Sequence, residues 1–119
     1  MAKLSTHVLD TAKGMPAEGV RWTLYLLDGE RKKIGAGRTN KDGRTNTPLI
    51  MSTTIQTGIY ELVFEVADYF IRIGADLSKN SFLDIIPIRF RVFDGKQDYH
   101  IPLLVAPYGY STYRGSWES

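Results

Sequence analysis

The chain has 119 residues, 43% hydrophobic and 24% charged, which is typical of globular proteins, and residues 1–119 are predicted to form one domain. Its formal net charge is +2 and its basic residues are scattered among acidic ones, so no nucleic-acid partner is expected. The absence of cysteine excludes disulfides and cysteine-ligated metal sites. No stretch approaches the roughly 20 apolar residues of a membrane-spanning helix, so no membrane partner is expected. The first residues lack the apolar run of a secretory signal, so the cytoplasm is the expected location.

Short segments in which apolar and polar residues alternate recur about every ten residues along the chain. Between these segments lie turn-forming residues, Gly, Asn, Asp and Pro, for example at residues 13–16, 40–43 and 94–96. This spacing predicts an all-β protein, an antiparallel sandwich of seven or eight strands. The densest basic cluster, Arg-Lys-Lys at residues 31–33, follows Asp28-Gly29 and is interpreted as a solvated turn between two strands.

Four segments place large apolar residues on one face, as strands with one side in a core do. The four faces are Val20, Trp22, Leu24 and Leu26; Tyr60, Leu62, Phe64 and Val66; Ile86, Ile88, Phe90 and Val92; and Tyr99, Ile101, Leu103 and Val105. These residues are predicted to form the core. One short helix is predicted at residues 67–74, with Asp68 as its cap and Gly74 as its end.

Two histidines carry the groups that titrate near neutral pH. His7 lies in residues 4–10, where alternation sends its ring to the side opposite its neighbours. His100 lies on the face opposite Tyr99 and Ile101, so it is predicted to leave the core. A lone histidine in a small domain is more often structural than catalytic, but two imidazoles on outer faces can work together in proton transfer.

A cation and the chain end add further candidates. Arg44 follows the turn signal at residues 42–43; it is either a surface arginine or a guanidinium that a turn fixes to bind a carbonyl or an anionic heterocycle. The chain end combines a stacking ring, a second cation, a flexible joint and a hydroxyl, in Tyr113, Arg114, Gly115 and Ser116. By composition alone such a tail is commonly frayed.

Two familiar types of catalytic site are not supported by the residues. A Ser-His-Asp triad can be assembled on paper from Ser116, either histidine and Asp10 or Asp98, but no nucleophile-elbow glycine pattern surrounds any serine. Two histidines without a third close ligand make a poor catalytic zinc site, although two histidines can still bind a metal adventitiously between subunits. No required metal is predicted.

Four segments form a specific combination of motifs. They are residues 4–10 (Leu-Ser-Thr-His-Val-Leu-Asp), the Asp42-Gly43-Arg44 turn, residues 99–104 (Tyr-His-Ile-Pro-Leu-Leu) and residues 107–116, which end in Tyr-Arg-Gly-Ser. Together they resemble the 5-hydroxyisourate hydrolase family, the transthyretin-related enzymes, over nearly the whole chain. The histidine segments and the closing tetrapeptide distinguish these hydrolases from transthyretin, a hormone carrier of the same fold.

This resemblance implies a transthyretin-like antiparallel β-sandwich of about eight strands with one short helix, assembled as a homotetramer, a dimer of dimers, with sites in the channel between dimers. It implies hydrolysis of the N1–C6 amide of 5-hydroxyisourate to 2-oxo-4-hydroxy-4-carboxy-5-ureidoimidazoline in urate degradation, with no cofactor. The implied catalytic residues are His7, Arg44, His100 and Ser116. The implied substrate-binding residues are Arg44, Tyr113, Arg114 and Gly115.

The end of the chain departs from the family pattern. The Tyr-Arg-Gly-Ser tetrapeptide usually ends the chain, whereas Trp117, Glu118 and Ser119 follow it here. These three residues are either an expression remnant or a natural extension. Two other functions remain open: a binding module that holds a small aromatic ligand in the same channel without transforming it, and a plain adhesion domain, which is expected beside other modules.

Overall fold

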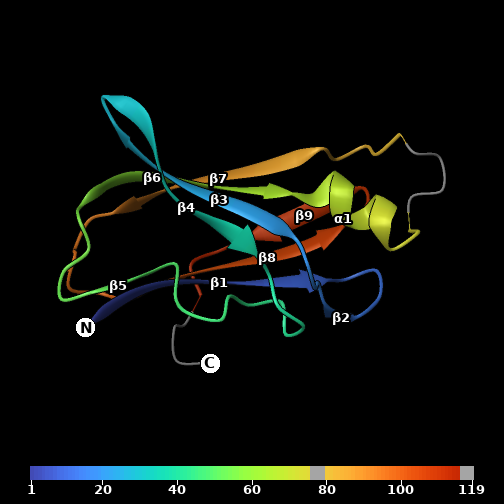
Figure 1. Ribbon diagram of the computed structural model, residues 1–119, viewed down its shortest axis with the longest axis horizontal. Helices are drawn as coiled ribbons and strands as arrows, with labels where there is room; N and C mark the ends of the chain where they lie inside the picture. The colour runs from blue at the N-terminus through green and yellow to red at the C-terminus, as the bar shows by residue number, and fades with distance from the viewer. Residues whose placement is uncertain (76–79, 116–119) are drawn as a thin grey trace.

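The computed structural model describes residues 1–75 and 80–115, which form two β-sheets packed face to face with a helix at one end (Figure 1). The first sheet has the order β2–β1–β8–β9, with β5 also paired to β1, and the second has the order β4–β3–β6–β7. The elements are β1 (Ala2–Asp10), β2 (Met15–Pro16), β3 (Arg21–Asp28), β4 (Glu30–Arg38), β5 (Ile50–Ser52), β6 (Gly58–Glu65), α1 (Val66–Arg72), β7 (Ile85–Val92), β8 (Tyr99–Ala106) and β9 (Gly109–Thr112).

The predicted all-β sandwich with one short helix is confirmed, with two differences in detail. The described residues form nine strands because two short ones, β2 and β5, pair with opposite ends of β1. One pair is not antiparallel: β1 and β8 run parallel, with Leu4 opposite Tyr99 and Asp10 opposite Val105. This pair joins the two ends of the chain in the middle of one sheet.

The predicted core faces are confirmed. Residues on these faces are buried between the sheets, except that Trp22 and Phe90 are only partly buried. Trp22 lies over Gly35 and Gly37 of the neighbouring strand, where a Cβ on Gly37 would lie 3.1 Å from the indole. The alternation of inward-facing and outward-facing side chains thus fixes which face of each strand lies outside the core, where a site can form.

The helix α1 begins one residue earlier than predicted, so Asp68 is not its cap. Glu65 occupies the cap position without a side-chain hydrogen bond, and Asp68 lies in the first turn. The predicted end is confirmed: Gly74 has φ +77°, its N–H donates to Ile71, and the next N–H donates to Phe70, which is the Schellman arrangement. Among the described residues no helix is long and apolar enough to span a membrane.

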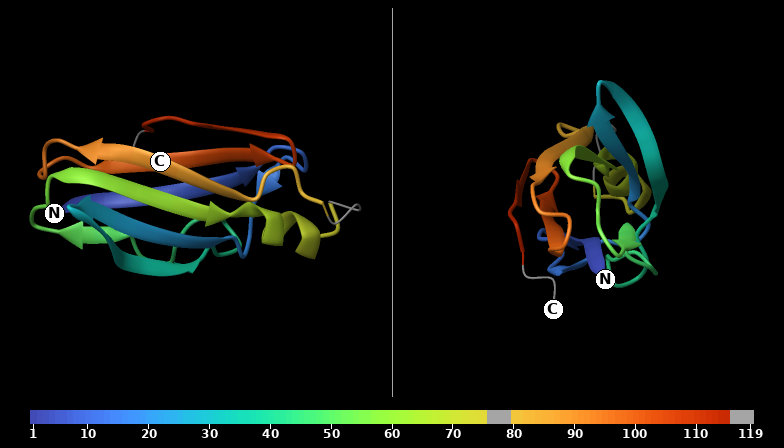
Figure 2. Two further views of the ribbon diagram at one scale, coloured as in Figure 1. Left: turned by 90° about the horizontal axis from the view of Figure 1, so that it is seen from above. Right: turned by 90° about the vertical axis from the view of Figure 1, so that its left-hand side faces the viewer.

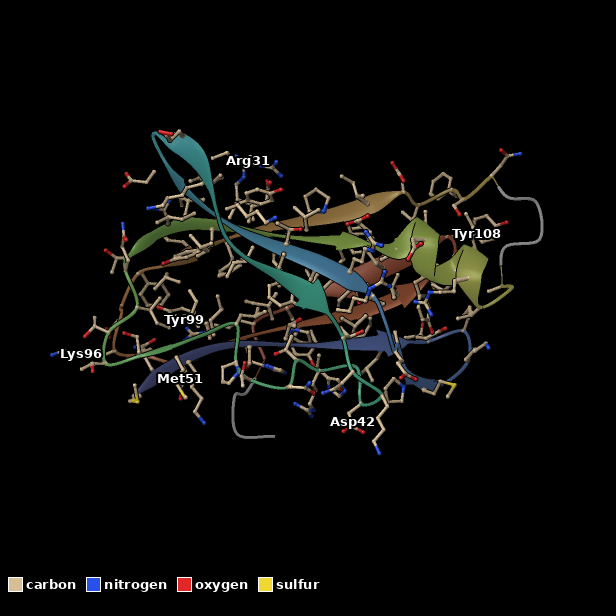
Figure 3. The ribbon with its side chains drawn as sticks, viewed as in Figure 1. Arg31, Asp42, Met51, Lys96, Tyr99 and Tyr108 are labelled. Atoms are coloured by element: carbon tan, nitrogen blue, oxygen red, sulfur yellow. The ribbon has the colours of Figure 1, made fainter. Side chains whose placement is uncertain are left out.

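The basic cluster at residues 31–33 is not a turn, because β4 begins at Glu30 and the turn is confined to the Asp28–Gly29 region. Arg31, near the projecting end of the β3–β4 hairpin (Figure 3), donates to Glu61 at 2.9 Å and lies over the ring of Tyr25. Glu61 also accepts from Arg89, and its pKa is lowered, first by the hydrogen bond from Arg31. Arg31, the first residue of the cluster, therefore stabilises the outer face of the second sheet.

Asp10 is a buried carboxylate that connects β1 to the helix. Its Oδ1 accepts hydrogen bonds from the N–H groups of Ala12 and Lys13, and its Oδ2 accepts one from the hydroxyl of Tyr69 at 2.8 Å. Burial and this carboxylate raise the pKa of Tyr69 well above its usual range. Asp10 thus fixes the turn after β1 and the position of α1 against the sandwich.

Replacing Asp10 by Ala is expected to lower the free energy of unfolding by about 3 kcal/mol, because the Tyr69 hydroxyl and two backbone donors lose their acceptor. Tyr69→Phe removes one of these bonds and is expected to cost about 1–2 kcal/mol. Urea unfolding followed by far-UV circular dichroism measures both. Equal stability of Asp10→Ala and the parent protein would contradict this role.

Candidate active site

The parallel pairing of β1 and β8 brings the two histidines to the same outer face of the first sheet. Ser5 is opposite His100, and His7 is opposite Pro102. Since the inward faces of both strands are occupied by core residues, these side chains point away from the second sheet. The prediction that both histidines leave the core is therefore confirmed, although His100 is only 5% exposed because the chain end covers it.

The loop after β4 places Arg44 beside β1. The side-chain oxygen of Asn40 accepts from the N–H groups of Asp42 and Arg44, which closes a tight turn. The Gly43 carbonyl then accepts from Val8 at 2.7 Å, and Figure 3 shows Asp42 in the loop alongside β1. Gly43 has φ +75°, and a Cβ there would lie 2.3 Å from the Val8 carbonyl, so only glycine allows this approach.

The chain end returns over His100 after β9. The hydroxyl of Thr112 donates to the Pro102 carbonyl at 2.7 Å, and the N–H of Gly115 donates to the His100 carbonyl at 2.8 Å. A Cβ on Gly115 would lie 2.9 Å from Cδ2 of His100 and 3.2 Å from Pro102. The absence of a side chain at Gly115 is what allows the tail to lie against the imidazole.

These three parts of the chain enclose a pocket of about 340 Å³ on the outer face of the first sheet. It is lined by His7, Leu9, Arg44, His100, Pro102, Tyr113 and Gly115. Five residues singled out in the sequence therefore meet in one place, from β1, the loop after β4, β8 and the tail. Ser116 follows Gly115 and, like Trp117, Glu118 and Ser119, lies outside the described residues.

Arg114 does not line this pocket. Its guanidinium donates to the side chain of Gln97 at 3.1 Å and to the carbonyl of Asp98 at 3.0 Å. It also lies 4.4 Å from the centre of the Tyr99 ring. Arg114 therefore anchors the tail to the start of β8.

The electrostatic environment keeps both imidazoles neutral. Burial lowers the pKa of His7 below its usual value, and the positive charge of Arg44 adds to this, while the backbone and carboxylate of Asp42 act in the opposite direction. Burial also lowers the pKa of His100, followed by the charges of Arg44 and His7. Two neutral imidazoles near a guanidinium can accept or donate protons while the cation binds negative charge.

The arrangement offers few ligands for a metal ion. Within residues 1–75 and 80–115 no three His, Asp or Glu side chains gather where they could hold one. The pocket itself places two imidazoles beside a guanidinium, and proton transfer next to a positive charge suits the attack of water on a carbonyl group.

Three residues at the site were not singled out by their sequence. Leu9 and Pro102 line the pocket, and Ser5 Oγ lies 2.8 Å from Nδ1 of His100. Alternation alone puts Ser5 and Leu9 on the same face as His7, and Pro102 on the same face as His100. What the sequence did not show was that these two faces are adjacent, because the parallel pairing joins segments 95 residues apart.

Comparison with known proteins identifies the family of this chain. The family model described as HIUase/Transthyretin family matches residues 4–115. The chain is 50% identical over 115 residues to "5-hydroxyisourate hydrolase 2" of Rhizobium meliloti, covering 96% of each chain.

Two solved structures have the same fold. The 5-hydroxyisourate hydrolase of Klebsiella pneumoniae superposes with a TM-score of 0.81 at 34% identity, over 98% of this chain and all of that one. Sea bream transthyretin, solved in complex with thyroxine, superposes with a TM-score of 0.84 at 25% identity, over 99% of this chain and 98% of that one. The chain therefore belongs to the HIUase/Transthyretin family.

Proposed function

We propose that this protein hydrolyses the N1–C6 amide of 5-hydroxyisourate in urate degradation, giving 2-oxo-4-hydroxy-4-carboxy-5-ureidoimidazoline. The observation that carries this proposal is the pocket in which His7, His100 and Arg44 meet. Relatives at about half identity over nearly the full chain have the name of this hydrolase, including those of Rhizobium meliloti and Ralstonia nicotianae. We place the reaction in the cytoplasm.

The mechanism that we propose starts with a water molecule held between the two imidazoles. One imidazole takes a proton from this water as the oxygen bonds to C6, and the negative charge moves onto the C6 oxygen. Arg44 stabilises this charge; a preorganised donor of this kind commonly contributes about 3–4 kcal/mol. As the N1–C6 bond breaks, the proton passes to N1, so the imidazole returns to its neutral state.

Two elements of this mechanism rest on the family resemblance. Ser116 is proposed to help position the water with its hydroxyl, as the family resemblance implies; in the sequence it follows Gly115, which lines the pocket. Tyr113 is proposed to contact the substrate ring, because it lines the pocket from the tail. Arg114 contributes indirectly, through the hydrogen bonds that hold this tail to Gln97 and Asp98. No organic cofactor has a part in these steps.

We also propose that the active protein is a homotetramer, a dimer of dimers. The strands β7 and β9 are at the edges of their sheets and lie along the same side of the sandwich (Figure 2). Unpaired edges and exposed aromatic side chains such as Tyr108 (Figure 3) and Tyr110 favour pairing with a second copy. In the tetramer, the second dimer would face the outer side of the first sheet and cover the pocket, which is open to solvent in a single subunit.

The direct test follows the ultraviolet decay of 5-hydroxyisourate, freshly generated from urate by urate oxidase, with and without the protein. The substrate also decays unaided, so the rate in buffer is subtracted. Decay that accelerates in proportion to protein concentration is the expected result. Decay no faster than in buffer would contradict the hydrolase and favour a binding protein, as the likeness to the thyroxine-bound sea bream transthyretin allows.

Replacing Gly115 by Ala is expected to lower kcat by about tenfold or more, because the added methyl group would overlap the edge of His100 and displace the ring or the tail. Gly109→Ala is the matched control, since a Cβ at Gly109 meets no atom within 4 Å. Steady-state rates of the two variants give the comparison. Parent-like rates in Gly115→Ala would show that the tail need not lie against His100 during turnover.

A further inference from the structure

We propose that Ser5 is a positioning residue for the reaction: its hydroxyl donates a hydrogen bond to Nδ1 of His100 and keeps the imidazole proton on Nε2. This inference rests on the proposed hydrolase function and deepens it by giving the two histidines different roles. His7 is then the group that accepts the proton of the attacking water. His100 remains protonated on Nε2 throughout and donates a hydrogen bond into the pocket.

The geometry around His100 fixes the orientation of its ring. Ser5 Oγ lies 2.8 Å from Nδ1, on the neighbouring strand and directly opposite in the parallel register. Gly115 packs against the Cδ2 edge of the ring, and Pro102 lies beside it. With His100 only 5% exposed, the ring has little space to turn, so one nitrogen faces Ser5 and the other edge faces the tail and the pocket.

The chemistry of the contact indicates which nitrogen carries the proton. In the part of the chain that the structure describes, Nδ1 of His100 is the one hydrogen-bond partner of the Ser5 hydroxyl. Donation to Nδ1 therefore satisfies both groups, and in a neutral ring it leaves the proton on Nε2. The ring stays neutral because burial, Arg44 and His7 all lower the pKa of His100.

The surroundings of His7 select the opposite role. His7 lines the same pocket from the neighbouring strand, together with Arg44. Burial and the charge of Arg44 lower the pKa of His7, which favours its neutral form, and a neutral imidazole has one nitrogen with a free lone pair. Since Nε2 of His100 holds a proton, His7 is the imidazole that accepts a proton of water.

This division of roles gives a balanced reaction. Water loses one proton to His7 as its oxygen bonds to C6, and the resulting imidazolium gives that proton to N1 as the N1–C6 bond breaks. His100 donates its Nε2–H to the negative oxygen beside Arg44 and ends the cycle unchanged. A neutral imidazole with a lowered pKa is suited to this task, because its N–H can polarise a carbonyl without being lost.

Nitrogen NMR of the imidazoles tests the proposal without turnover. The chain has two histidines, so [15N]histidine labelling gives four ring signals, which the His7→Gln variant assigns. At pH 7.5 we expect Nδ1 of His100 to have the shift of an unprotonated nitrogen and Nε2 that of a protonated one. Ser5→Ala is expected to bring both shifts towards the average of two tautomers, and Ser5→Thr, which keeps the hydroxyl, to retain the parent shifts. A protonated Nδ1 in the parent protein would overturn the proposal.

Kinetics provide the second readout. Ser5→Ala is expected to lower kcat by about 10- to 100-fold, by analogy with the loss of a hydrogen bond that orients a metal-bound histidine, and Ser5→Thr is expected to restore it. Ser52→Ala, a serine on β5, is the matched control and is expected to match the parent. A parent-like kcat in Ser5→Ala would overturn the proposal. If the parent protein itself gave no turnover, the proposed function would fail while the NMR result on Ser5 would still stand.

Discussion

Replacing His7 by Gln is expected to lower kcat/KM for 5-hydroxyisourate by about 10²- to 10⁴-fold, because the pocket loses its acceptor for the proton of water. Glutamine keeps the approximate size and polarity of the side chain but has no group that titrates near neutral pH. His7 is partly buried on the outer face of β1 and does not belong to the core cluster between the sheets, so the fold is not expected to depend on it.

The measurement compares the initial decay rate of 5-hydroxyisourate in the parent and in His7→Gln, with the buffer rate subtracted from both. Circular dichroism and the urea midpoint of both proteins exclude unfolding as the cause of a loss. The same experiment with His100→Gln is expected to give a loss of similar size. A rate within threefold of the parent for either folded variant would remove that histidine from the site.

Replacing Arg44 by Gln is expected to have two separate effects. The first is a loss of about 10²- to 10³-fold in kcat, since the guanidinium no longer stabilises the charge on the C6 oxygen. The second is a shift of the pH profile, because the positive charge of Arg44 lowers the pKa of both His7 and His100. Without this charge both pKa values rise.

The direction of the pH effect follows from the protonation state that the reaction needs. The acceptor imidazole must be neutral, so activity is lost as the pH falls through its pKa, which in the parent lies below the usual 6.5. In Arg44→Gln this loss is expected at higher pH, so the variant is more strongly impaired at pH 5.5 than at pH 8. Arg44→Lys keeps the charge and is expected to retain the parent profile. Arg21→Gln, a change at an exposed arginine, is the control and should alter neither kcat nor the pH profile. If the pH profile of Arg44→Gln were the same as that of the parent, the charge of Arg44 would not lower the pKa of the acceptor imidazole.

The arrangement of the core could be predicted from local sequence because four segments turn one apolar face towards the space between the sheets. The alternation of Tyr99, Ile101, Leu103 and Val105 with polar or outer residues placed His100 correctly on the far side of β8. The end of the helix could also be predicted from local sequence. The Schellman motif at Gly74 needs a residue with positive φ, and glycine adopts this conformation at a low energetic cost. These features depend on neighbours within a few positions.

The features that could not be predicted depend on contacts between distant segments. The parallel pairing of β1 with β8 has no local signal, and the role of Ser5 depends on it entirely. The contacts of Arg114 are a second example. Its side chain meets the ring of Tyr99 and the carbonyl of Asp98, which only the packed structure brings within reach.

The central claim is that His7 and His100, from opposite ends of the chain, act on one substrate in one pocket. A double-mutant cycle of substrate decay rates, with the parent, His7→Gln, His100→Gln and the double variant, tests it most directly. If the two imidazoles act as a unit, the double variant is expected to be no more than about tenfold slower than the slower single variant, because the second change removes a partner that has already lost its function. Losses that multiply in full would show that the two histidines act independently and would contradict a shared site.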